Sequence, residues 1–286
     1  METTPKPNLT SPREVAALLN AHGLRPNKVL GQNFLIDRNI LDLIVATAEL
    51  DPTAKVLEVG AGLGVLTEQL MEHCAHVTSV EKDPGLHKIL EERWGTDERL
   101  TLILGDALEI DLAGILASGT RHLVSNLPYS VGVRVVVDAA TCETPPDVMA
   151  LLLQKEVGER FAAKPGTADM GAITVWLQQL YDVTLVRNVK PTCFHPRPEV
   201  TSVIIKLKRH NRFPLDSAAR LKLRTLTKAS FLHRRKQMAS AMRDAPEGLA
   251  RDTIFTREAL SACGATETAR PEELSVAQWI NLAARW

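Results

Sequence analysis

The stretch KVLEVGAGLGVLTEQL, residues 55–70, decides the fold of this chain. Its first part, KVLEV, is typical of a buried strand, and its last part, VLTEQL, has helical spacing. Gly60, Gly62 and Gly64 lie between them, where the chain turns sharply and the backbone can approach a ligand closely. Because several nucleotide-binding folds use a turn of this kind, it predicts a strand–turn–helix unit before it predicts any one ligand.

Apolar runs of the same kind recur and alternate with segments of helical spacing. We expect further buried parallel strands at 76–81, 100–104, 122–126 and 148–153. Two later strands, 182–189 and 200–208, flank a loop too short for a crossover helix, so they should be antiparallel and close the sheet edge. This alternation predicts an α/β fold with a doubly wound, mostly parallel sheet and an antiparallel edge.

The pattern becomes helical and basic from Pro214 onward, which predicts a small all-helical C-terminal domain. Helical spacing covers 216–232, 234–242, 256–264 and 276–286. We therefore divide the chain into an N-terminal extension (1–26), a sheet domain (27–212) and a basic helical domain (213–286).

Charge is distributed unevenly, although the formal net charge is zero. Residues 1–186 hold 15 Lys and Arg against 25 Asp and Glu, whereas residues 187–286 hold 19 against 9. Within 206–236 there are eleven basic residues and one acid, Asp216. A solvated helix face accounts for some of these charges, but an excess this large favours a surface that binds a polyanion.

Composition excludes several other classes of protein. The chain has 286 residues, 45% of them hydrophobic, which is enough for a large core. Its four cysteines are widely spaced and form no CxxC pair, which argues against a metal site or a disulfide framework. The N-terminus has no apolar signal region, and no apolar run approaches the length of a membrane span. We expect a soluble, cytoplasmic monomer without metal.

Polar residues at the ends of the predicted strands indicate the cofactor. The spacing of the glycine turn places Val65 where the dinucleotide-binding fingerprint has its third glycine. Glu81 ends the next strand, where a carboxylate can accept hydrogen bonds from both ribose hydroxyls, and Asp106 follows the third strand and can receive the adenine amine. Alone, Glu81 would be a surface acid and Asp106 a helix cap. Together in strand order they predict an S-adenosylmethionine site.

The turn SNLPYS, residues 125–130, follows the fourth strand at the same edge of the sheet. Asn and Pro are ordinary turn formers, and Tyr often covers a core edge. At this edge, however, the Asn126 side-chain oxygen and the Leu127 carbonyl can accept the two N–H bonds of an adenine amino group. Pro128 would hold the backbone, and Tyr129 would stack on a base. The turn therefore predicts methylation of an amino group.

The order of the motifs resembles one family closely. LGQNFLID (30–37), EVGAGLG, GDAL, NLPYS, LQKEV (153–157), FHPRPEV (194–200) and FLHRRK (231–236) occur as in the KsgA/RsmA ribosomal RNA adenine dimethyltransferases. The resemblance runs from about Asn27 to Trp286. It implies a Rossmann-like class I methyltransferase domain with a helical C-terminal domain. Val133-Arg134, Thr201 and Ser240 depart from the family pattern, at helix starts and loops rather than at the acceptors.

The resemblance also implies roles for individual residues. Asn33 and Leu35 would contact the methionine end of the cofactor, Gly60 and Gly62 would contact it at the turn, and Asn126 would face its reacting end. Phe194 would stack on the target adenine opposite Tyr129. His195 needs no catalytic role, because the reaction requires no imidazole. The basic helical domain would hold RNA through Arg224, Lys228, Arg234, Arg235 and Lys236.

The function implied is dimethylation at N6 of two adjacent adenines near the 3′ end of 16S rRNA, within the small (30S) subunit or its precursor. A role in late subunit assembly goes with it. Two alternatives remain: an Erm-type enzyme that methylates 23S rRNA, and a non-catalytic RNA-binding assembly factor. A DNA adenine methyltransferase is not expected, because those enzymes often carry a Pro-Pro-Tyr turn and a separate target-recognition domain.

Overall fold

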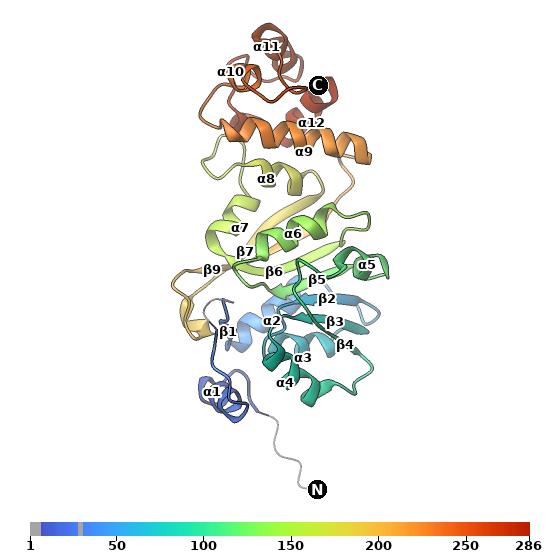
Figure 1. Ribbon diagram of the computed structural model, residues 1–286, viewed down its shortest axis with the longest axis vertical. Helices are drawn as coiled ribbons and strands as arrows, with labels where there is room; N and C mark the ends of the chain where they lie inside the picture. Colours follow the sequence, from blue (N-terminus) through green and yellow to red (C-terminus); the bar gives the residue numbers. More distant parts are fainter. Residues whose placement is uncertain (1–6, 28–30) are drawn as a thin grey trace. The chain divides into compact units, whose positions relative to one another are not determined.

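The computed structural model describes residues 7–27 and 31–286 (Figure 1). Leu30 of the LGQNFLID motif and the first six residues of the predicted N-terminal extension lie outside the described residues. The chain forms two compact units. The first contains the described residues up to Gly158 together with Thr184–Lys208, and the second contains Glu159–Val183 and Arg209–Trp286.

The first unit contains the glycine-rich turn and most of the sheet. Its helices are α1 (Pro12–Ala21), α2 (Arg38–Thr47), α3 (Val65–Met71), α4 (Pro84–Trp94), α5 (Leu112–Ala117) and α6 (Gly132–Thr141), and a short 3-10 helix spans Pro191–Cys193. Its strands are β1 (Phe34–Leu35), β2 (Lys55–Val59), β3 (His76–Glu81), β4 (Leu100–Leu104), β5 (His122–Asn126), β6 (Val148–Gln154) and β8 (Phe194–His195). Three elements include residues of both units: α7 (Lys155–Phe161), β7 (Tyr181–Val189) and β9 (Ser202–Arg209).

The main sheet has the strand order β4-β3-β2-β5-β6-β9-β7. Strands β4, β3, β2, β5 and β6 pair in parallel, and β9 pairs antiparallel with β6, which confirms the predicted α/β sheet with an antiparallel part. The chain proceeds outward from β2 through β3 to β4 and then returns to place β5 on the other side of β2 (Figure 1). This reversal of strand order creates a crevice beyond the carboxyl ends of β2 and β5, where open α/β sheets bind ligands.

Local chemistry explains why these segments form and where they end. Six of the seven residues of β6 are buried, all but Gln154, as expected for a central strand covered on both faces. Helix α4 begins with Pro84 after Asp83, whose carboxylate accepts hydrogen bonds from the backbone N–H groups of Gly85 and Leu86. Such caps determine where each helix starts after its strand. They therefore also determine the length of the loops that border the crevice.

The second unit is helical. It contains α8 (Ala172–Gln178), α9 (Ser217–Leu232), α10 (Met238–Arg243), α11 (Thr253–Ala262), α12 (Val276–Arg285) and a 3-10 helix at Pro271–Glu273. We predicted a boundary at 212, with residues 159–183 in the sheet domain, whereas these residues group here with the C-terminal helices. The reason is apolar packing, because Met170 and Val175 share a buried cluster with Leu260 and Trp279.

Two predicted helical segments differ from the structure. The partly helical spacing of residues 107–116 predicts a helix there, but residues 107–110 form a turn and a bend, and α5 starts only after Asp111, whose side chain accepts a hydrogen bond from the Gly114 N–H. Residues 234–236, which we predicted as helical, form a turn between α9 and α10. Among the described residues, no helix combines the length and the apolar character needed to cross a bilayer.

Candidate active site

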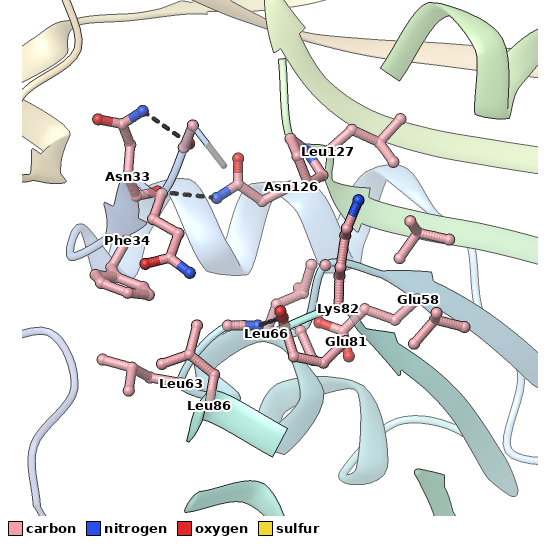
Figure 2. A pocket seen from close by; sticks show the side chains of 18 of the residues that line it. Asn33, Phe34, Glu58, Leu63, Leu66, Glu81, Lys82, Leu86, Asn126 and Leu127 are labelled. Carbon is pink, nitrogen blue, oxygen red and sulfur yellow. Dashed lines mark hydrogen bonds between the residues drawn. The ribbon is translucent and has the colours of Figure 1, made fainter. Parts of the chain in front are cut away.

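A pocket lies at the carboxyl ends of the parallel strands of the first unit (Figure 2). Its empty space, open solvent included, is about 1170 Å³, and its lining comes from the ends of strands β2, β3, β4 and β5 and from the QNFL segment. Ten of the eleven residues predicted for cofactor binding or catalysis line it: Asn33, Leu35, Gly60, Gly62, Glu81, Asp106, Asn126, Leu127, Pro128 and Tyr129. The eleventh, Phe194, does not.

The glycine turn forms the floor of the pocket. Gly60 and Gly62 have φ angles of +79° and +60°, which residues with a side chain rarely adopt. A Cβ atom on Gly60 would lie 2.9 Å from the Cγ and Cδ atoms of Pro128. The glycine turn and the NLPYS turn are therefore packed directly against one another, and only glycine leaves room for this contact.

Glu81 is held at the end of β3 by two backbone donors. Its Oε2 accepts the N–H of Gly62 and its Oε1 accepts the N–H of Asp83, each at 2.8 Å. The side chain is buried, and desolvation raises the pKa of its carboxyl above the usual range, an effect that the two N–H donors oppose. Each carboxylate oxygen keeps a lone pair for a further donor, so Glu81 can still receive ligand hydroxyls.

Asp106 lies at the same edge, after β4, and both of its oxygens have partners. The Lys82 ammonium lies 2.5 Å from Oδ2, and the Leu108 N–H donates to Oδ1 at 2.9 Å. The Lys82 ammonium holds the pKa of the Asp106 carboxyl below its ordinary value. Asp106 is thus ionised and lines the pocket, and it belongs to a turn and caps no helix, because Asp111 is the N-cap of α5.

Hydrogen bonds to two neighbouring strands hold the first half of the SNLPYS turn. The Ser125 hydroxyl donates to the carbonyl oxygen of Val59 in β2, and the Leu127 N–H donates to the Leu152 carbonyl at 3.2 Å. The Asn126 side chain donates its Nδ2 to the backbone oxygen of Asn33 at 3.5 Å (Figure 2). This bond leaves Oδ1 as the acceptor, and no donor from the described residues reaches it.

The two aromatic residues predicted to stack on a base lie in different surroundings. Tyr129 lines the pocket with its ring half-buried, and its hydroxyl lies 2.6 Å from the Ser202 hydroxyl. Burial raises the pKa of the Tyr129 phenol, so it stays protonated at neutral pH. Phe194 is only 2% exposed and packs in the apolar core, where it pairs with Leu35 of β1. The predicted pairing of Tyr129 and Phe194 around one base stays a prediction.

The QNFL segment lies along one side of the pocket. Phe34 and Leu35 form β1 and are buried, as in the alternative that treats them as core, and both also line the pocket. The Asn33 side chain donates to the Gly31 carbonyl at 3.0 Å. The segment is therefore both core and pocket wall, a combination that its sequence alone does not reveal.

Among the pocket residues that were not predicted from sequence, Glu58, Lys82 and Leu9 differ in the signal they carry. Glu58, only 1% exposed, accepts hydrogen bonds from the hydroxyls of Thr67 and Ser79, and desolvation raises its pKa to about 7. A lone acid in an apolar strand is the local signal that marks Glu58. Lys82 also carries a local signal, because it directly follows Glu81 in the sequence. Leu9 had none, because only the tertiary fold brings it to the pocket.

The pocket fits S-adenosylmethionine in its chemistry. The glycine turn lacks the side chains that would fill the space above β2, and Glu81 and Asp106 supply acceptors at two separate strand ends. Leu63, Leu66 and Leu86 supply apolar surface on the lower side of the cavity (Figure 2). This combination of acceptors and apolar walls suits an adenosine group with a charged amino-acid tail.

The predicted RNA-binding residues all belong to the second unit, and their surroundings differ. Arg224 lies with its guanidinium carbon 5.1 Å from the centre of the Trp176 ring. Arg234 donates to the Thr167 carbonyl at 3.2 Å, and Lys236 pairs with Asp244 at 3.1 Å. Lys228 and Arg235 are exposed and have no ion pair with any described residue.

Part of the basic segment 206–236 is neutralised by acids distant in sequence. Lys206 and Lys208 both pair with Glu49, the latter at 2.9 Å, and hold the pKa of that carboxyl at about 2. Arg212 pairs with Asp182 at 2.5 Å. The polyanion-binding charge predicted from composition is therefore smaller than the count of eleven basic residues suggests.

Comparison with known proteins gives one family. The pattern of the family described as "Ribosomal RNA adenine dimethylase" matches residues 23–284. The Ribosomal RNA small subunit methyltransferase A of Geobacter metallireducens is 36% identical over 93% of this chain and 97% of its own length. The protein of the same name from Phenylobacterium zucineum is 37% identical over 94% of this chain and 90% of its own length.

Solved structures show the same fold. A dimethyladenosine transferase from Plasmodium falciparum is similar with a TM-score of 0.74 and 21% identity, over 87% of this chain and 95% of that one. The 23S rRNA methyltransferase ErmE is similar with a TM-score of 0.67 and 27% identity, over 88% of this chain and 99% of that one.

Proposed function

This chain belongs to the ribosomal RNA adenine dimethylase family, and we propose that it dimethylates N6 of two adjacent adenines in the 3′-terminal hairpin of 16S rRNA. The observation that supports the proposal most directly is that ten of the eleven predicted site residues line one pocket, where the glycine turn contacts Pro128 of the NLPYS turn. The substrate is the RNA within the small subunit or its precursor, and the protein acts late in assembly of that subunit.

The residues at the strand ends hold the cofactor. S-adenosylmethionine supplies an electrophilic methyl group on a sulfonium. Glu81 accepts the ribose hydroxyls through the lone pairs that its backbone donors leave free. Asp106 receives the adenine amine, and the glycine turn lies against the middle of the molecule. Asn33 and Leu35 contact the methionine end.

The Asn-Leu-Pro-Tyr turn prepares the attacking nitrogen. An adenine amino group is a poor nucleophile because its lone pair is delocalised into the ring. Asn126 Oδ1 and the Leu127 carbonyl accept its two N–H bonds and favour the pyramidal nitrogen, whose lone pair then points toward the methyl group. Asn126 is suited to this role because its Nδ2 bond to Asn33 leaves the oxygen as the acceptor. No strong base is needed, since alkylated nitrogen loses its proton readily to water.

Base stacking and backbone contacts complete substrate binding. A flipped adenine stacks on the Tyr129 ring, a contact worth about 1–3 kcal/mol per base. Phe194 would join this stack only after its ring leaves the core position described above. The RNA backbone binds the basic residues of the second unit, of which Lys228 and Arg235 carry the charge most available to phosphate.

The test is methylation of small subunits from a strain that lacks the dimethylation. The subunits are incubated with the protein and S-adenosylmethionine, and the 3′-terminal hairpin is excised with nuclease and analysed by mass spectrometry. We expect dimethyladenine at two adjacent positions. A parallel reaction with 23S rRNA serves as the control.

Methylation of 23S rRNA alone would assign the Erm-type function instead. That alternative has less support, because ErmE is 27% identical to this chain, whereas the small-subunit enzymes of Geobacter metallireducens and Phenylobacterium zucineum are 36% and 37% identical. Tight RNA binding without methylation of either RNA would leave the non-catalytic assembly factor.

A further inference from the structure

The segment that precedes the QNFL motif contributes to the pocket. We call residues 7–24 the N-terminal arm; it contains a tight turn at residues 8–11 and helix α1. Leu9, at the tip of the turn, is only 4% exposed and lines the same pocket as Glu81 and Asn126. No motif in the sequence marked this residue for a role.

Hydrogen bonds fix the direction in which Leu9 points. The Asn8 carbonyl accepts the N–H of Ser11 at 3.0 Å, and the Asn8 side-chain oxygen accepts the N–H of Thr10 at 3.0 Å. The Glu14 carboxylate accepts the N–H of Asn8 at 2.5 Å. These bonds satisfy the polar groups of the turn locally, so its apolar residue is presented to the pocket in one orientation.

Leu9 belongs to an apolar cluster that forms one wall of the cavity. The arm contributes Leu9, Val15 and Leu19 to this cluster. The pocket contributes Phe34, Leu63 and Leu86, which surround the lower left of the cavity in Figure 2. The Phe34 ring lies 3.4 Å from the position of a Cβ on Gly62, whose N–H is bonded to Glu81. The wall therefore stands beside the carboxylate assigned to the ribose.

The arm is attached to α4 at a second point. The imidazole of His22 lies 2.9 Å from the Glu92 carboxylate, and its other ring nitrogen lies 2.9 Å from the Leu18 carbonyl. Leu24 packs over the first turn of α4, where a Cβ on Gly85 would lie 2.6 Å from its Cδ2 atom. The N-terminal arm is therefore held at both ends, by Leu9 in the pocket wall and by His22 and Leu24 against α4.

We propose that the N-terminal arm is part of the cofactor site, with Leu9 forming the wall beside the ribose of bound S-adenosylmethionine. This inference rests on the function proposed above. Leu9 contributes apolar contact and keeps water away from Glu81, where hydrogen bonds to ribose gain strength as the local dielectric constant falls. Without the contacts of the N-terminal arm, S-adenosylmethionine should dissociate faster from the pocket.

The test compares two leucine truncations on the same arm. Leu9→Ala removes the pocket wall, whereas Leu18→Ala removes a partly buried side chain that packs on the cluster and does not line the pocket. The dissociation constant of S-adenosylmethionine is measured by calorimetry on the full chain. We expect about a tenfold rise for Leu9→Ala and less than a twofold change for Leu18→Ala. Equal values for Leu9→Ala and the unchanged protein would overturn the proposal.

A second variant decides the question if Leu9→Ala does not fold. His22→Ala leaves the apolar cluster intact and removes only the contacts with Glu92 and the Leu18 carbonyl. We expect a two- to fourfold rise in the dissociation constant, and no change would count against a role for the arm. Failure of the unchanged protein to bind S-adenosylmethionine would instead refute the proposed function. The role of the N-terminal arm and the proposed function can therefore be refuted independently.

Discussion

The sequence predicted both the pocket of the first unit and the basic surface of the second, and the structure agrees with the first prediction more closely than with the second. In the pocket, ten of eleven predicted residues line one cavity. On the surface of the second unit, Arg212 is paired with Asp182 and Lys236 with Asp244, whereas Lys228 and Arg235 have no ion pair with a described residue. Strand ends place the pocket residues through the backbone, whereas long charged side chains on the surface pair with whichever acids the fold brings near them.

The largest effect should come from the pocket. Asn126→Ala removes an acceptor at the reacting nitrogen, and we expect the methyl-transfer rate to fall by about 10²–10³-fold, as for the loss of one preorganised polar group in other enzymes. RNA affinity should stay within a few-fold. The rate is measured by methyl incorporation into small subunits.

The matched control is Asn188→Ala, an exposed Asn on β7 outside the pocket, which should leave the rate unchanged. Residual methylation in Asn126→Ala together with a collapse of RNA binding would contradict the acceptor role. The residue would then act as an RNA contact.

The buried Glu58 should make stability depend on pH. Its pKa is about 7 in the folded protein against an ordinary value of 4.5, so the folded state binds the proton more tightly than the unfolded state. Its contribution to the free energy of unfolding is fully present below pH 4.5 and is lost as pH rises through 7, a total of about 3 kcal/mol.

Glu58→Gln should remove this part of the pH dependence, because the amide does not titrate and can still accept from Thr67 or Ser79. Urea denaturation of both proteins between pH 4.5 and 8 measures the difference. Parallel pH profiles would show that the pKa of Glu58 is the same in the folded and unfolded states, which would contradict this prediction.

Neutralising the turn between α9 and α10 should have a moderate effect. Replacing Arg234, Arg235 and Lys236 with Gln should weaken RNA binding by about tenfold at moderate salt. It should also reduce the slope of log affinity against log salt by about 0.7–0.9 for each phosphate that the protein no longer neutralises. Fluorescence anisotropy with a labelled hairpin, titrated at several salt concentrations, measures both quantities.

Three cations of the first unit provide the control. Arg38, Lys88 and Arg134 are each paired with a carboxylate four residues further along a helix. Their triple Gln variant removes the same charge and should leave the salt slope unchanged. An equal loss of affinity in both variants would mean that RNA responds to overall charge and not to this turn.

The smallest expected effect is a difference in RNA affinity between replacing an unpaired lysine and replacing a paired one. Lys228→Ala should weaken RNA binding about two- to threefold, because the exposed ammonium has no acid partner among the described residues. Lys208→Ala should change it by less, because that ammonium already pairs with Glu49 at 2.9 Å. Anisotropy at low salt resolves the two. Equal decreases in affinity would remove the distinction between the two kinds of lysine.

The sequence by itself determined the sheet, the glycine turn and the residues that end each strand. Periodicity places those residues, and carboxyl ends of parallel strands meet at one edge whatever the surrounding side chains are. Glu81, Asp106 and Asn126 could be found for this reason, and strand β5 ends at Asn126 as its apolar run predicts.

Only the tertiary structure decided which distant groups meet. Leu9 reaches the pocket through the packing of α1, Phe194 is drawn into the core beside Leu35, and Glu49 neutralises two lysines more than 150 positions away. Residues 159–183 group with the C-terminal helices because Met170 and Val175 fill a cluster around Trp279. Contacts of this kind depend on complementary shape and charge between surfaces, and no local pattern along a chain encodes its partner.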